Sequence, residues 1–144
     1  NICRDIKEDA ERGRIYLPIN IIRGLTTENI LSPTKQQLID INQARDRLLN
    51  RADLYYESGY QGIEHLPKKT ARSLKIAAQL YQGIGKKMLK SKKTYLDGRI
   101  YLNKLEKSLI SMQIVLRRNN INATKIHNHL LHDSIRKLPD SHNK

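Results

Sequence analysis

The sequence contains neither tryptophan nor phenylalanine, and seven tyrosines carry all of its aromatic character. The hydrophobic core must therefore be built from leucine, isoleucine, alanine and tyrosine side chains. A single cysteine, Cys3, excludes an internal disulfide and fits a reducing compartment. No apolar run approaches the roughly 18 residues that a membrane-spanning helix requires. These absences favour a cytoplasmic protein.

Acidic residues are also scarce, with 14 Asp and Glu against 27 Lys and Arg, which gives a formal net charge of +13. Such a balance indicates partners that carry phosphate groups, nucleic acid or an anionic membrane surface. Part of the charge lies in one basic cluster, which consists of Lys86, Lys87, Lys90, Lys92 and Lys93. The cluster is typical of a solvated helix face, and it equally suits peripheral contact with anionic lipid at the inner membrane face.

Helical periodicity dominates the chain of 144 residues, which is long enough for one domain. Apolar residues recur at steps of three and four, and no segment shows the alternation of a strand. We expect helices over residues 33–66, 68–90 and 105–118, with Ser32 as N-cap and Pro33 at the first helical position of the first of these. A shorter helix is expected after Thr26 or Thr27.

Residues 1–118 are predicted to form the helical domain, and residues 119–144 a polar, poorly ordered tail. Within the long helix, Gly59 and Gly62 are interpreted as sites of close helix packing. The tail contains three histidines, which we interpret as polar tail residues rather than a metal site: His127, His129 and His132.

The opening stretch, NICRDIKEDAERGRIYLP, carries the strongest functional pattern. On a helix at about 100° per residue, Asn1, Asp5 and Asp9 follow one another at single-turn intervals on one polar arc. Two carboxylates at this spacing repel each other, so a cation is expected between them. Oxygen ligands of this kind suit Mg²⁺, and Arg4 and Arg12 flank the arc where they can meet phosphate oxygens. The spacing alone also describes an ordinary solvated helix face.

The complete pattern N-x-x-R-D-x-x-x-D-x-x-R-G-R-I-Y-L-P resembles the second aspartate-rich motif of the squalene/phytoene synthase family, the head-to-head prenyl synthases. Residues 51–67, RADLYYESGYQGIEHLP, are similar to the family segment R-A-x-x-Y-Y-x-x-A-x-x-G-x-x-x-L-P. Residues 79–109 are similar to the last family block, which contains Y-x-x-I-G and G-R-I. The resemblance covers about residues 1–118.

This resemblance implies an all-α, isoprenoid-synthase-type helical bundle around a deep pocket, of which this chain is the C-terminal part only. In the family, two aspartate-rich motifs hold Mg²⁺ (or Mn²⁺) on prenyl diphosphates. The first motif and its helices, the N-terminal half of the fold, are expected to precede Asn1 and to be the partner of this chain. The isolated chain is therefore expected to be inactive.

The resemblance also assigns roles to single residues. It implies metal binding by Asn1, Asp5 and Asp9. It implies catalytic roles for Asp5, Asp9 and Tyr81, and substrate binding by Arg4, Tyr81 and Arg99. Taken without the resemblance, Tyr81 is typical of a core tyrosine and Arg99 of a surface charge.

The implied function is that of a transferase that condenses two molecules of geranylgeranyl diphosphate head to head into phytoene and releases diphosphate. The alternative is a squalene-type synthase that uses farnesyl diphosphate, and the sequence leaves the substrate length and an NADPH requirement open. A different class, a non-enzymatic basic helical module that binds nucleic acid, is favoured only by the charge. No helix-turn-helix, zinc-finger or RRM pattern supports it.

Overall fold

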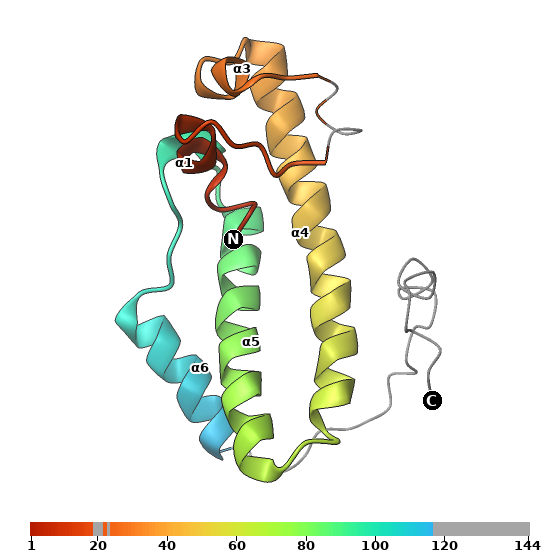
Figure 1. Ribbon diagram of the computed structural model, residues 1–144. Helices are drawn as coiled ribbons and strands as arrows, with labels where there is room; N and C mark the ends of the chain where they lie inside the picture. The colour runs from red at the N-terminus through yellow and green to blue at the C-terminus, as the bar shows by residue number, and fades with distance from the viewer. Residues whose placement is uncertain (19–21, 23, 117–144) are drawn as a thin grey trace, which may run out of the picture.

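The computed structural model describes residues 1–18, 22 and 24–116 (Figure 1). These residues form helices α1 (Ile6–Glu11), α3 (Thr27–Leu31), α4 (Lys35–Ile63), α5 (Lys68–Lys90) and α6 (Lys104–Leu116), with a 3₁₀ turn, η1 (Tyr95–Asp97). The described ranges contain no strand, so the all-α prediction is confirmed. None of their helices is both long and apolar enough to cross a membrane. The predicted tail and its three histidines lie outside the described residues.

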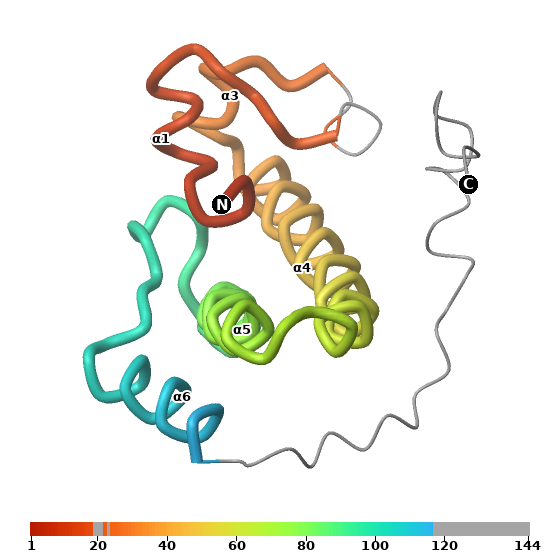
Figure 2. Tube along the Cα trace, turned by 60° about the horizontal axis from the view of Figure 1, so that its bottom comes forward, coloured from red at the N-terminus to blue at the C-terminus, as the bar shows by residue number. Residues whose placement is uncertain are grey.

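Helices α4 and α5 are antiparallel neighbours and form the body of the fold (Figure 1). Helix α6 packs on α5, and α1 and α3 contact each other beside the first turns of α4 (Figure 2). The N-terminus lies between α4 and the last turns of α5. This arrangement brings the opening residues next to the long helices.

The start of α4 differs from the sequence prediction. Its N-cap is Thr34, whose hydroxyl accepts the backbone N–H of Gln37 at 3.2 Å, while the Gln37 side chain accepts the N–H of Thr34 at 2.8 Å. This reciprocal capping box satisfies two otherwise unpaired donors. Ser32 instead caps the end of α3, with its N–H on the carbonyl of Glu28. By contrast, the predicted bounds of the 68–90 helix and the cap at Thr26 are confirmed.

Helix α1 is shorter than the predicted opening helix. Residues 2–4 form turns, and the helix begins at Ile6. Ile6 and Ala10, which are four residues apart on one helical face, are buried, but Ile2 is 47% exposed. The apolar residues that recur at helical spacing along α6 are likewise at least 50% exposed: Leu105, Leu109, Met112, Val115 and Leu116.

The glycines that permit close helix packing are not the predicted ones. A Cβ atom at Gly59 or Gly62 would meet no atom within 4 Å. On α5, however, a Cβ at Gly83 would lie 3.2 Å from the Leu102 side chain, and one at Gly85 would lie 3.3 Å from Leu49. Glycines on α5 therefore allow close approach to both of its neighbours.

The main core joins the opening residues, α3, the first half of α4 and η1, and its buried residues are Ile6, Ala10, Leu17, Ile22, Ile30, Ile41 and Tyr95. The hydroxyl of Tyr95 donates a hydrogen bond of 2.7 Å to the backbone carbonyl of Ile30. Through this bond, η1 holds α3 in place although the two lie far apart in the sequence.

Replacing Tyr95 by phenylalanine is expected to lower the free energy of unfolding by about 1–3 kcal/mol, because the buried Ile30 carbonyl loses its hydroxyl donor. Burial raises the pKa of Tyr95 from 10.0 to about 12. The neutral hydroxyl therefore stabilises the fold below pH 10, and this contribution is lost as the pH rises toward 12. Urea denaturation across this range should show a shallower alkaline decline for Tyr95→Phe than for the wild type. Parallel declines would contradict the assignment.

Candidate active site

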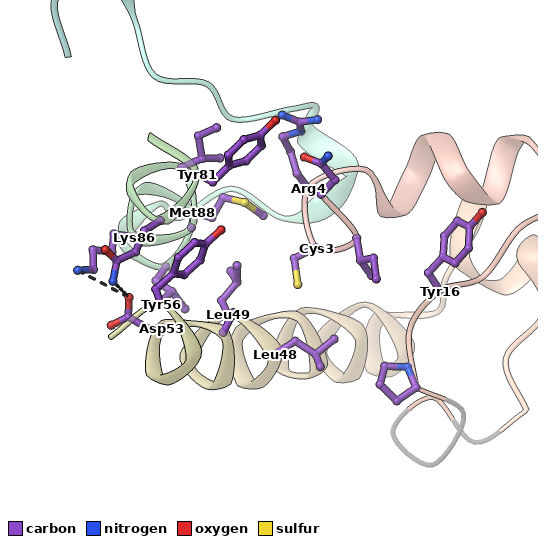
Figure 3. Close-up of a pocket in the computed structure, with 18 residues that line it drawn as sticks. Cys3, Arg4, Tyr16, Leu48, Leu49, Asp53, Tyr56, Tyr81, Lys86 and Met88 are labelled. Atoms are coloured by element: carbon purple, nitrogen blue, oxygen red, sulfur yellow. Dashed lines mark hydrogen bonds and ion pairs between the residues drawn. The ribbon is translucent and has the colours of Figure 1, made fainter. Parts of the chain in front are cut away.

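A cavity of about 330 Å³ lies between the opening residues, α4 and α5 (Figure 3). Its lining is mainly apolar and includes Leu48, Leu49, Ala52, Ile84, Met88 and Leu89. Polar side chains lie in two groups around it, with Arg4 next to Tyr81 and Asp53 next to Lys86. An apolar cavity with a few placed polar groups is the usual form of a small-molecule site.

The backbone places the three candidate metal ligands at single-turn intervals, as the spacing predicts. The N–H of Asp5 donates to the carbonyl of Asn1 at 3.0 Å, and the N–H of Asp9 donates to the carbonyl of Asp5 at 2.8 Å. Their side chains have different surroundings: Asn1 lines the cavity, whereas Asp9 lines a small hollow that also includes Arg14. Within the described ranges, no group of three or more His, Cys, Asp or Glu side chains is placed to hold a metal ion.

Two arginines surround the carboxylate of Asp5. Nε of Arg4 donates to its Oδ1 at 2.8 Å and Nη2 donates to its Oδ2 at 3.0 Å, while Nε of Arg99 lies 2.9 Å from Oδ1. The hydrogen bonds from Arg4, assisted by the charge of Arg99, lower the pKa of Asp5 below its ordinary value of 3.8. Asp5 is therefore ionised at neutral pH, with Arg4 and Arg99 as its cationic partners.

Arg99 reaches a second carboxylate as well. Its Nε atom lies 2.8 Å from Oε1 of Glu8, but this buried N–H points at neither carboxylate in hydrogen-bonding geometry. Arg99 does not line the cavity. Its guanidinium lies beside α1, where it shares the carboxylate of Asp5 with Arg4. Glu8 lies on the same polar arc as Asp5, but no local spacing predicts Arg99 as its partner.

Tyr81 lines the cavity from α5 with its hydroxyl toward Arg4 (Figure 3). It is 52% exposed, so the core-tyrosine interpretation is wrong. Arg4, Asn1 and Tyr81 are the predicted site residues that the structure brings together at the cavity.

Sequence reasoning missed a polar network that joins α4 and α5 beside the cavity. The side chain of Gln82 donates to Oδ1 of Asp53 and accepts a 2.9 Å hydrogen bond from the Tyr60 hydroxyl. Nζ of Lys86 lies 3.7 Å from the same carboxylate oxygen. Burial raises the pKa of Tyr60 to about 12, which keeps its hydroxyl a donor. These residues come from two helices, so no local spacing could reveal the network.

The donor set fits a hard cation together with an anion. Asn1, Asp5 and Asp9 offer amide and carboxylate oxygens, which Mg²⁺ prefers. A carboxylate has about four acceptor positions. At Asp5, both Arg4 and Arg99 approach Oδ1, whereas only Arg4 approaches Oδ2. Oδ2 can therefore still accept a further ligand. The unpartnered N–H of Arg99 suits an oxygen of a bound anion.

An all-helical chain that places these groups beside an apolar cavity has the features of an isoprenoid-synthase-type protein. The squalene/phytoene synthase family matches residues 1–106, and the chain belongs to this family. The predicted family membership and the predicted similarity to bacterial phytoene synthases are thereby confirmed.

Individual relatives agree with this assignment. The chain is 39% identical to 15-cis-phytoene synthase of Enterobacter agglomerans over 93 residues, which cover 63% of this chain and 31% of the relative. It is 33% identical to phytoene synthase of Rhodobacter capsulatus over 109 residues, which cover 72% of this chain and 31% of the relative. The matched region therefore spans about a third of these relatives. No solved structure matches the chain significantly.

Proposed function

We propose that this chain forms one side of the active site of a transferase that condenses two prenyl diphosphates head to head and releases diphosphate. The observation that carries the proposal is the position of the opening motif, with Asn1 and Arg4 lining an apolar cavity and Asp5 bound to Arg4. The names of the relatives support the phytoene type, with geranylgeranyl diphosphate as substrate. The squalene type with farnesyl diphosphate is the alternative.

The polar residues of the site would bind the metal ion and the diphosphate group. Asn1, Asp5 and Asp9 would hold Mg²⁺ (or Mn²⁺), which when bound neutralises the negative charge that develops on the leaving diphosphate. Arg4 uses two nitrogens on Asp5, and a guanidinium has five N–H donors, so further donors remain for diphosphate oxygens. The hydroxyl of Tyr81 lies on the same side of the cavity and would add a donor.

The apolar walls would protect the carbocation that forms when diphosphate leaves. Leu48, Leu49 and Leu89 carry no nucleophilic group, and these apolar walls would help to exclude water once the opposite side of the site is in place. A small residue, Ala52 on α4, leaves room for the prenyl chain.

Two partners complete the proposal. The N-terminal half of the fold, with the other aspartate-rich motif, would form the opposite side of the site. Peripheral membrane contact through the basic cluster stays a prediction: Lys86 and Lys87 form ion pairs with Asp53 and Glu106, while Lys90, Lys92 and Lys93 are exposed.

The test is a hybrid synthase in which this chain replaces the matching segment of the Enterobacter agglomerans enzyme. With geranylgeranyl diphosphate and Mg²⁺, the hybrid is expected to release diphosphate and form phytoene, and EDTA should stop both. Product formed only from farnesyl diphosphate with NADPH would favour the squalene type. A folded hybrid that forms neither product, or a chain that binds RNA with an affinity that falls steeply with salt, would refute the proposal.

A further inference from the structure

Within the part of the chain that the structure describes, Arg99 pairs with two carboxylates, Asp5 and Glu8, whereas Arg4 pairs with Asp5 alone. We propose that Glu8 is a positioning residue that holds Arg99 beside Asp5, where Arg99 meets the diphosphate group of the substrate. This inference rests on the proposed function and adds to it a residue that does not itself touch the substrate or the metal ion.

The backbone around Arg99 does little to fix its side chain. Arg99 follows Gly98, which has a φ of +86°, in the extended segment between η1 and α6. No helical hydrogen bonds hold this segment, so the ion pairs of the guanidinium, together with its hydrogen bond to Tyr101, determine where it lies. Nε of Arg99 is 2.9 Å from Asp5 and 2.8 Å from Glu8.

Burial strengthens these contacts relative to ordinary surface pairs. The side chains of Asp5, Glu8 and Arg99 are 16%, 28% and 31% exposed. Partly shielded charges attract each other more strongly than fully solvated ones. The pair between Glu8 and Arg99 therefore contributes to the position of Arg99.

The two carboxylates differ in what they would do once substrate is bound. Asp5 is a candidate metal ligand, so part of its charge would be directed to the cation and its attraction for Arg99 would weaken. Glu8 has no such competing role and would keep Arg99 at the site. The Nε–H of Arg99, which has no hydrogen-bond acceptor in line, is then available to a phosphate oxygen.

The first experiment uses Glu8→Gln in the hybrid synthase. We expect the KM for geranylgeranyl diphosphate to rise roughly tenfold, as for other residues that orient a binding group, with kcat changed by less than about threefold. The matched control is Glu11→Gln on the same helix, where the carboxylate is 51% exposed and lies 4.0 Å from Lys7; it should leave both constants unchanged. The double variant Glu8→Gln/Arg99→Gln should be no worse than Arg99→Gln alone, because both changes remove one interaction.

A second measurement uses the chain itself and needs no activity. The Nε–H proton of Arg99 is buried, and Glu8→Gln should release the guanidinium from this position. Followed by NMR, the proton should therefore exchange with water several times faster in Glu8→Gln than in the wild type, and Glu11→Gln should not change it. An unchanged exchange rate would overturn the inference, as would additive effects in the double variant or a fall in kcat at constant KM. An inactive hybrid whose Arg99 signal still responds to Glu8→Gln would refute the proposed function and reduce Glu8 to a structural ion-pair partner.

Discussion

Asp5→Asn in the hybrid synthase is expected to lower kcat by roughly 10²–10³, the loss typical when one stabiliser of developing negative charge is removed. Asparagine keeps the size and one oxygen of aspartate but removes the charge that would hold Mg²⁺. Because the charge on the leaving diphosphate grows as its bond breaks, the loss falls on turnover far more than on substrate binding. The measurement is kcat and KM at saturating Mg²⁺.

The structure also decides which carboxylate serves as the control for Asp5→Asn. Glu8 lies on the same arc but contacts Arg99, so removing its charge is not neutral. Glu11, with its distant contact to Lys7, carries the same charge on the same helix, and Glu11→Gln should change kcat by less than about twofold. Equal damage from both variants would mean that the arc acts only as a general charged face.

The sequence predicted the long helices well because their patterns are local. Steps of three and four in apolar residues located α4 and α5, and Pro67 separates them at the expected place. The predicted start of α4 was wrong because two neighbouring residues, Ser32 and Thr34, are both good N-caps. The capping box between Thr34 and Gln37 makes Thr34 the N-cap.

Contacts between helices were not predictable from local patterns. Gly59 and Gly62 resemble packing glycines, but the side of a helix that meets a neighbour depends on where the other helices lie. In this fold the neighbours approach Gly83 and Gly85 instead. The exposed apolar side of α6 has the same explanation, since the apolar pattern shows which residues share a face but not what covers that face.

For the candidate site, the sequence identified the residues better than their partners. The opening motif and its family resemblance led to Asn1, Arg4 and Tyr81, which line the cavity. The roles of Asp9 and of the metal ion stay predictions. The contact between Glu8 and Arg99 joins residues from opposite ends of the described chain, and only the three-dimensional structure shows it.

The largest expected effect on stability is that of Ile41→Ala on α4. Ile41 is 0% exposed and belongs to the core cluster that also contains Ile6 and Ile30. Removing a fully buried isoleucine side chain typically costs about 2–5 kcal/mol, because both the burial of the removed atoms and the packing around them are lost. Domains of ordinary stability have about 5–15 kcal/mol in total, so this loss is a large fraction of the free energy of unfolding.

Ile39→Ala provides a matched control two positions earlier on the same helix. Ile39 is 41% exposed, and its truncation should cost less than about 1 kcal/mol, as at other sites outside the core. Urea denaturation of the two variants, followed by helical circular dichroism, measures the difference directly. Because the cluster of Ile41 also contains Ile6 and Ala10 of α1, Ile41→Ala should in addition loosen the opening motif and speed the exchange of the Arg99 Nε–H proton. Equal losses from the two variants would show that this core does not hold the motif in place.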